Sequence, residues 1–108
     1  MSVRPLLTVP RQVRAGEAFE VRILIQHPME TGFRRDSVGR PVAQDIINRF
    51  ECSVDGEAVF SATLHPSISA NPFLAFSVRL ARSGTMLFRW VDDQGAEGRE
   101  SVPIAVVG

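Results

Sequence analysis

The side chains that could carry chemistry in this chain are one cysteine, two histidines and three methionines. Cys52, His27, His65, Met29 and Met86 include the ligand types of a blue-copper centre, which needs two His, one Cys thiolate and usually a Met close behind the Cys. Cys52 is instead followed by Ser-Val-Asp-Gly, which is typical of a strand end and a turn. The spacing therefore argues against copper, and we expect no metal ion and no other cofactor.

A nucleophilic role for Cys52, with a histidine as its base, is the second possibility. The alternation of residues 46–54 places Cys52 beside Phe50 on the core face, where a thiol behaves as a small hydrophobe and its pKa rises. Asp92 and Asp93 are predicted to lie in a hairpin turn, where Asp hydrogen-bonds its own backbone. The sequence has no glycine-rich phosphate loop, no Cys-x-x-Cys pair and no HExxH motif. We expect no catalytic site, and the chain is predicted not to be an enzyme.

Length and composition indicate one globular domain that spans residues 1–108. Hydrophobic residues make up 44% of the chain and charged residues 22%, which excludes intrinsic disorder. Twelve arginines balance twelve acidic residues, and this balance argues against binding to nucleic acid or to an anionic membrane. A single cysteine cannot form a disulfide within the chain. No secretory signal and no apolar run of about 20 residues is found, so no membrane span is expected.

The elements that must position these side chains are predicted to be strands, because apolar residues recur with a period of two. Asp55-Gly56 is a strong signal for a hairpin turn, and Pro103 indicates that part of the last strand lies at a sheet edge. The inward set of residues 57–64 is predicted to be Ala58, Phe60, Ala62 and Leu64. We expect an all-β, immunoglobulin-like antiparallel β-sandwich of about seven strands. The predicted strands are residues 3–9 (an edge strand), 17–26, 46–54, 57–64, 73–80, 85–91 and the last strand around 102–106.

Two segments, residues 27–45 and 65–72, lack clear periodicity. A structureless loop longer than about 12–15 residues in a compact domain is usually functional or disordered. The longer segment contains Met29 and Phe33, which could anchor it to a partner, and its three cations equal its three acids in number. Edge strands and such a loop are common materials of a partner interface. The alternative, that the loop only covers an open end of the sandwich, stays open at this point.

Several motifs occur together and in order along nearly the whole chain: HPMETG at residues 27–32, then RRD, IINRF-x-C at residues 46–52, Asp-Gly, and ISANP-F at residues 68–73. In this combination the sequence resembles the SoxZ family, the small subunit of the thiosulfate-oxidation carrier complex. The resemblance implies a non-catalytic partner of SoxY, the subunit that carries sulfur intermediates on a cysteine of a glycine-rich C-terminal arm. It also implies transient contacts with other sulfur-oxidation enzymes, and a periplasmic location reached by co-export with the partner. Isolated from its partner, such a subunit could form a homodimer through its uncovered apolar face.

The most distinctive stretches are also the ones that strand patterning explains least, so we expect them at or near the partner contact. We expect alanine at Met29 or Phe73 to weaken assembly and to leave thermal unfolding nearly unchanged. The alternative to the SoxZ reading is a free-standing immunoglobulin-like binding or enzyme-accessory module with an unrelated partner. The candidate interface residues are His27, Pro28, Met29, Glu30, Phe33, Ile68, Asn71 and Phe73.

Overall fold

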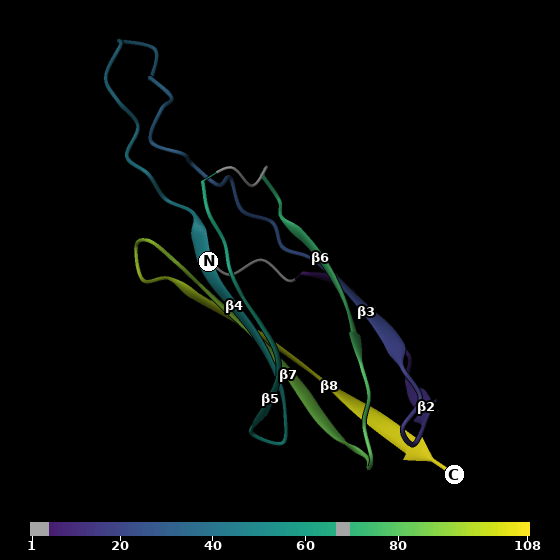
Figure 1. The fold of residues 1–108 in the computed structure, drawn as a ribbon. Coiled ribbons are helices and arrows are strands. Elements are labelled where there is room, and N and C mark those ends of the chain that lie inside the picture. Colours follow the sequence, from purple (N-terminus) through teal and green to yellow (C-terminus); the bar gives the residue numbers. More distant parts are fainter. Residues whose placement is uncertain (1–4, 67–69) are drawn as a thin grey trace.

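The computed structural model describes residues 5–66 and 70–108, which form two packed β-sheets (Figure 1). The smaller sheet has the strand order β1-β3-β6, and the larger one has the order β2-β8-β7-β4-β5. The described residues contain strands and no helix, and so no helix that could cross a membrane. The predicted all-β, immunoglobulin-like sandwich is confirmed, with one strand more than predicted. The strands are β1 (Leu6–Thr8), β2 (Gln12–Arg14), β3 (Phe19–Leu24), β4 (Ile47–Val54), β5 (Glu57–Thr63), β6 (Phe73–Val78), β7 (Gly84–Asp92) and β8 (Glu97–Val107).

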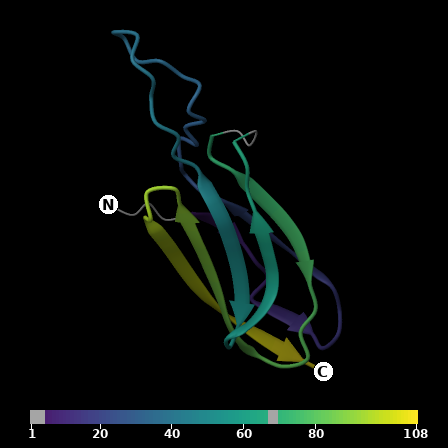
Figure 2. The ribbon, with the colours of Figure 1, turned by 60° about the vertical axis from the view of Figure 1, so that its left-hand side comes forward.

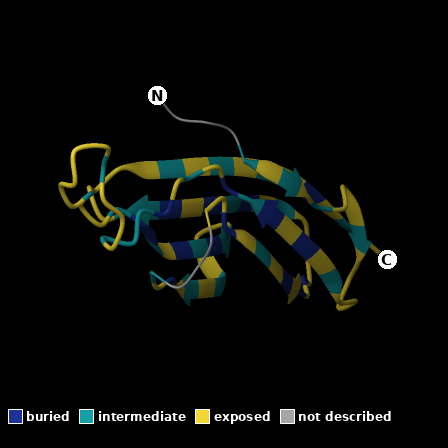
Figure 3. Ribbon diagram, turned by 90° about the horizontal axis from the view of Figure 1, so that it is seen from above, coloured by how far each residue is buried: buried dark blue, intermediate teal, exposed yellow. Residues whose placement is uncertain are grey.

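Alternating side chains build the core between the sheets, and Figure 3 shows this as bands of buried and exposed residues along the strands. On β3, Val21 and Ile23 are fully buried, whereas Glu20 and Arg22 point to solvent. Each apolar side chain of this size stabilises the fold by about 1.5–3 kcal/mol relative to leaving it exposed. On β7 the apolar residues at alternate positions are also buried, namely Met86, Phe88 and Trp90.

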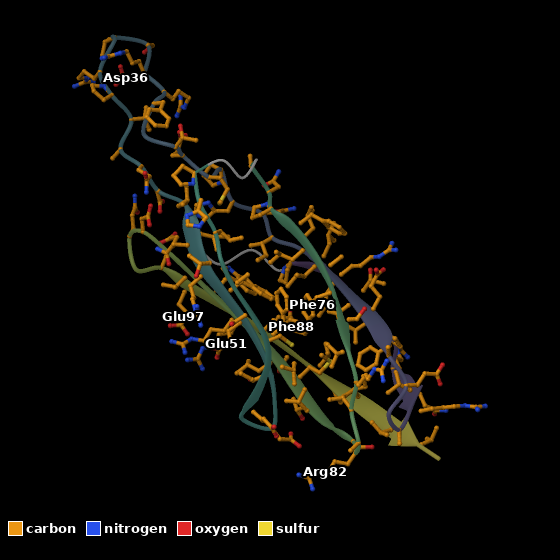
Figure 4. The ribbon with its side chains drawn as sticks, viewed as in Figure 1. Asp36, Glu51, Phe76, Arg82, Phe88 and Glu97 are labelled. Carbon is orange, nitrogen blue, oxygen red and sulfur yellow. The ribbon has the colours of Figure 1, made fainter. Side chains whose placement is uncertain are left out.

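Four phenylalanine rings join the two sheets at the centre of the core. The ring of Phe50 has its centroid 6.2 Å from that of Phe60, 6.0 Å from that of Phe76 and 6.4 Å from that of Phe88. Phe60 and Phe76 stack with centroids 4.1 Å apart. Phe76 lies on the smaller sheet and the other three on the larger sheet, so these contacts hold the sheets together (Figure 4). Aromatic pairs of this kind add about 0.5–1.5 kcal/mol beyond the area they bury.

One irregularity in β4 and one in β5 change which side chains face the core. The register with β7 shifts after Ile47, and both Ile46 and Ile47 are buried, although they are adjacent. The register with β5 shifts after Cys52. Because one extra residue moves the following side chains to the other face of a strand, Ala58 is exposed, and its predicted inward position is wrong.

The outer strands lie largely as predicted, apart from a short strand that the sequence analysis missed. β2 pairs in parallel with residues 105–107 of β8, so the sandwich is not purely antiparallel. The N–H of Ala105 donates to the carbonyl oxygen of Arg11, which places alternate residues of β8, including Pro103, toward the same edge. Proline has no N–H to donate there, and no described strand pairs with that part of the edge. The predicted edge position of Pro103 is confirmed, as is that of β1, whose described pairing is with β3 alone.

The connections between strands lie at the two ends of the sandwich (Figure 2). The β4–β5 hairpin turns at Asp55 and Gly56, whose φ angles of 49° and 86° are both positive, as a type I′ turn requires. This hairpin closes the opposite end. The β3–β4 loop, the β5–β6 loop and the β7–β8 turn therefore share the remaining end, and they position the candidate site.

Candidate interaction site

Residues 27–45 form a projecting finger, which is the name used below for this segment (Figures 1 and 2). Its two arms are joined at the base by reciprocal backbone hydrogen bonds between Glu30 and Asp45, at 2.9 and 2.8 Å. Further out, the N–H of Val42 donates to the carbonyl oxygen of Arg34 at 2.8 Å. The molecule measures 61 Å along its longest axis and about 20 Å across. The segment that the sequence predicts as an irregular loop is thus an irregular hairpin with paired arms.

The tip of the finger is closed by the carboxylate of Asp36 (Figure 4). Asp36 Oδ1 accepts hydrogen bonds from the backbone N–H groups of Val38 and Arg40, at 3.0 and 2.9 Å. The guanidinium of Arg35 donates to the carbonyl oxygen of Gly39 at 2.8 Å, and Gly39 has a φ of 84° that favours glycine. These bonds satisfy the backbone groups at the turn without any apolar burial.

An ion pair lies along one arm of the finger. Arg34 donates to both carboxylate oxygens of Glu30, at 2.6 and 3.0 Å. This hydrogen bonding lowers the pKa of Glu30 and raises the pKa of Arg34. Both groups are close to solvent, so the pair orients the arm more than it stabilises the chain.

Met29 lies at the base of the finger and belongs to the apolar core. Its side chain is 3% exposed, and the N–H of Ile47 donates to its sulfur at 3.2 Å. Its φ of 53° turns the chain sharply at this point, directly after the exposed Pro28. The structure therefore places Met29 in the core of the sandwich, and its location at or near the partner contact stays a prediction.

The two distinctive motifs of the sequence meet at the base of the finger. The N–H of His27 donates to Asn71 Oδ1 at 3.0 Å, and the N–H of Asn71 donates to the carbonyl oxygen of His27 at 2.7 Å. Asn71 has a φ of 54°, a conformation that Asn tolerates better than most residues. The two stretches therefore lie side by side at His27 and Asn71, whereas Ile68 lies outside the described residues.

Large apolar side chains are exposed at this end of the molecule. Phe33 on the finger is 87% exposed, and Phe73 at the start of β6 is 58% exposed. Val38 at the tip is also exposed, at 68%. Of the two residues named in the sequence as possible finger anchors, Phe33 is the one whose side chain is available for contact.

Asp93, interpreted from the sequence as a turn residue, also ties the finger to the sandwich. Its carboxylate accepts hydrogen bonds from Asn48 Nδ2 at 2.8 Å, Gln44 Nε2 at 2.9 Å and the N–H of Ile46 at 3.2 Å. These hydrogen bonds lower the pKa of Asp93, and the bond from Asn48 has the largest effect. Its partners lie 45–49 residues away along the chain, so no local signal could have identified this contact. The neighbouring Asp92 caps the turn as predicted, because its Oδ1 accepts from two backbone N–H groups of the turn.

Cys52 is not gathered with two histidines in the described chain, as a copper centre would require. Cys52 is fully buried, and this desolvation raises the pKa of its thiol to about 12. Among the described residues, no group of three candidate metal ligands contains Cys52 or His65. The thiol is therefore protonated at neutral pH and has neither a base nor a metal ion as a candidate partner in the described chain.

A second apolar surface lies away from the finger, where the two sheets separate. A groove of about 850 Å³ runs between β1 and β8, and Leu6 at its rim is 64% exposed. Its lining includes Leu7, Val9, Val102 and Pro103. No sequence pattern predicts this groove, because the groove depends on how the two sheets diverge.

Comparison with known families gives one assignment. The family model described as "Sulphur oxidation protein SoxZ" matches residues 7–103, which is most of the chain. No match to a curated protein reaches significance.

Solved structures with similar folds include superoxide reductases. The enzyme (neelaredoxin) from Ignicoccus hospitalis is 18% identical, with a TM-score of 0.73 over 98% of this chain and 82% of that chain. A single-residue variant of the same enzyme is 19% identical, with a TM-score of 0.72 over 95% of this chain and 79% of that one. A candidate superoxide reductase from Thermotoga maritima is 18% identical, with a TM-score of 0.72 over 96% and 86% of the two chains. At these identities the likeness extends to the fold alone.

Proposed function

The chain belongs to the SoxZ family of sulfur-oxidation proteins, and we propose that it is the non-catalytic subunit that holds and presents SoxY. The observation that carries this proposal is the family match over residues 7–103. In this division of labour, SoxY carries the sulfur intermediate on the cysteine of its C-terminal arm. The present chain supplies a rigid body against which the arm and the visiting enzymes are positioned.

The environment of Cys52 supports a role without covalent chemistry. A carrier or nucleophilic cysteine must be accessible and must ionise readily, because the thiolate is the reacting species. Cys52 is buried and the pKa of its thiol is about 12, far from the value that such a reaction needs. The covalent sulfur adduct therefore belongs on the partner.

The finger end is the surface that fits the proposed contact best. Exposed aromatic side chains on a well-ordered support are typical centres of protein interfaces. Phe33 projects from a finger whose arms and tip are held by backbone hydrogen bonds, so little ordering is required when it binds. We propose Phe33 and Phe73 as contact residues for SoxY or for the enzymes that it visits, with Pro28 and Glu30 beside them.

The proposal includes a periplasmic location, reached by co-export with SoxY. It also includes a reversible homodimer of the isolated chain, formed through apolar surface that SoxY would otherwise cover. The competing function is a free-standing immunoglobulin-like module with an unrelated partner, which would be monomeric and would not bind SoxY.

Co-expression with SoxY separates these functions. We expect the two chains to copurify at a 1:1 ratio through size-exclusion chromatography. The isolated chain should neither oxidise thiosulfate nor transfer sulfane sulfur to a thiol acceptor. The proposal would be contradicted if the two chains failed to copurify in both reducing and oxidising buffers. It would also be contradicted if the isolated chain transferred sulfur at a rate comparable with the complex.

A further inference from the structure

Three potential metal ligands meet at the base of the finger: His27, Asp45 and Asp92. One ligand atom from each lies within 4.8 Å of the other two, and His27 Nε2 lies 3.2 Å from Asp92 Oδ2. The side chains of His27 and Asp92 are only 13% and 11% exposed. The three residues come from the two arms of the finger and from the end of β7, so the fold, not local sequence, brings them together.

Asp45 gives an independent sign that something is missing at this place. Its Oδ1 is buried and has no hydrogen-bond partner in the described chain. Nearly all buried polar atoms in proteins have a partner, because an unpaired one costs the free energy of its lost hydration. Among the described residues no ion pair is found for Asp45, and His27 is the single ion-pair partner of Asp92. No arginine of the described chain is therefore paired with either of these two carboxylates.

We propose that His27 Nε2, Asp92 Oδ2 and the carboxylate of Asp45 bind a divalent transition-metal ion, with Zn²⁺ as the best match. Zn²⁺ takes imidazole nitrogen and carboxylate oxygen at about 2.0–2.2 Å, and two such ligands at a tetrahedral angle are roughly 3.3 Å apart. The 3.2 Å between His27 Nε2 and Asp92 Oδ2, which is also a hydrogen-bond distance, is compatible with this spacing. The imidazole ligand favours a transition metal over Ca²⁺ or Mg²⁺. The ion would give Asp45 Oδ1 a partner and would place a positive charge between the two carboxylates.

Proton positions around His27 make the proposal more specific. His27 Nδ1 accepts a hydrogen bond from the N–H of Met29 at 2.9 Å, so the proton of the neutral ring is on Nε2, toward Asp92. When Nε2 binds the ion, this proton moves to Nδ1 and the ring stays neutral. Nδ1 can then no longer accept from Met29, so the Met29 amide must lose this hydrogen bond when the ion binds.

The ion would fasten both arms of the finger to β7. His27 begins the outgoing arm, Asp45 ends the returning arm, and Asp92 ends β7. The site is thus structural, and its effect is to fix the angle at which the finger leaves the sandwich. This inference goes beyond the proposed function and does not depend on SoxY.

The test uses the full chain without an affinity tag, stripped with EDTA and then titrated with ZnCl₂. We expect 1:1 binding by calorimetry, with a dissociation constant on the order of 1 µM or lower. At a hundredfold excess over this constant the melting temperature should rise by about 10 °C. In ¹H–¹⁵N spectra the Met29 amide should be among the resonances that move most.

Matched variants assign the site. Asp45→Asn and His27→Gln should each weaken Zn²⁺ binding by at least about tenfold, because each removes one of three ligands. His65→Gln makes the same substitution at the exposed histidine and should leave the affinity unchanged. Asp45→Asn keeps the backbone pair with Glu30 and removes only an uncompensated charge, so it should fold even if His27→Gln does not. Absence of binding up to 1 mM Zn²⁺, equal affinity in Asp45→Asn, or an unmoved Met29 amide would each overturn the proposal.

Discussion

The sandwich body and the finger are stabilised in different ways. The body buries a continuous apolar core in which Phe50 and Phe88 have no exposed surface, and the stabilisation grows with the apolar area removed from water. The finger is held by backbone hydrogen bonds between its arms and by the Asp36 carboxylate at its tip, while Phe33 stays in solvent. The difference teaches that the stability of the body does not depend on the exposed side chains of the finger. Those side chains are free to serve a contact.

The largest effect on stability is expected from a core phenylalanine. Phe88→Ala should lower the free energy of unfolding by about 3–5 kcal/mol, because it leaves a cavity beside Phe50. Urea denaturation followed by the fluorescence of the buried Trp90 measures the loss. Phe73→Ala removes the same side chain from an exposed position and should cost less than about 1 kcal/mol. Equal losses of unfolding free energy in the two variants would contradict the distinction between the buried body and the exposed end.

Met29→Ala locates the boundary between the two regions. Because Met29 is buried in the core, we expect a loss of about 2–5 kcal/mol, in place of the unchanged unfolding expected from the sequence. The same urea measurement on Pro28→Ala, at the exposed neighbour, serves as the control and should show little change. An unchanged free energy of unfolding in Met29→Ala would mean that Met29 does not contribute to the core.

Alkaline pH should weaken the body through Cys52. The pKa of its thiol is about 12 in the folded chain and about 8.5 when unfolded, so the unfolded state releases its proton first. Stability from this group is fully present well below pH 8.5 and is lost as the pH rises toward 12, by on the order of 2 kcal/mol between pH 8.5 and 10.5. The chain contains no Tyr and no Lys, so few other groups titrate in this range. Cys52→Ala should lack this component, and parallel pH profiles of the two proteins would contradict the assignment.

A smaller and local effect is expected at the tip of the finger. Asp36→Ala removes the acceptor of the Val38 and Arg40 N–H groups and should cost about 0.5–1.5 kcal/mol. Hydrogen exchange should accelerate at these two amides and stay unchanged in β4 and β7. Ser37→Ala, at the same exposed turn, is the control. Faster exchange throughout the core would mean that the finger supports the body after all.

The period-two pattern was sufficient to predict the fold class and most of the core, because inward and outward side chains alternate strictly on β3 and β7. It failed at Ala58, where an extra residue in β5 moves side chains between faces. It also missed β2, whose three residues contain only one apolar side chain, Val13, and which is stabilised by its parallel pairing with β8. Register shifts and short pairings depend on the neighbouring strand and leave no periodic signal of their own.

The candidate site was predicted less completely than the fold. The motifs around His27 and Asn71 were recognised in the sequence, but their mutual hydrogen bonds join residues 44 positions apart and could not be predicted from it. The burial of Met29 could not be predicted either, because a loop sequence does not show which of its side chains enters the core. Asp93 and Asp45 carry no local signal, because their roles arise only when the finger folds back on the β7–β8 turn.

The affinity of SoxY for the Phe33→Ser variant, compared with the unchanged chain and with Leu6→Ser at the β1–β8 groove, tests the central claim most directly. We predict binding at least about tenfold weaker for Phe33→Ser, with the free energy of unfolding unchanged to within about 0.5 kcal/mol, and unaltered binding for Leu6→Ser. Full affinity in Phe33→Ser together with a loss in Leu6→Ser would contradict the account and place the SoxY contact at the groove.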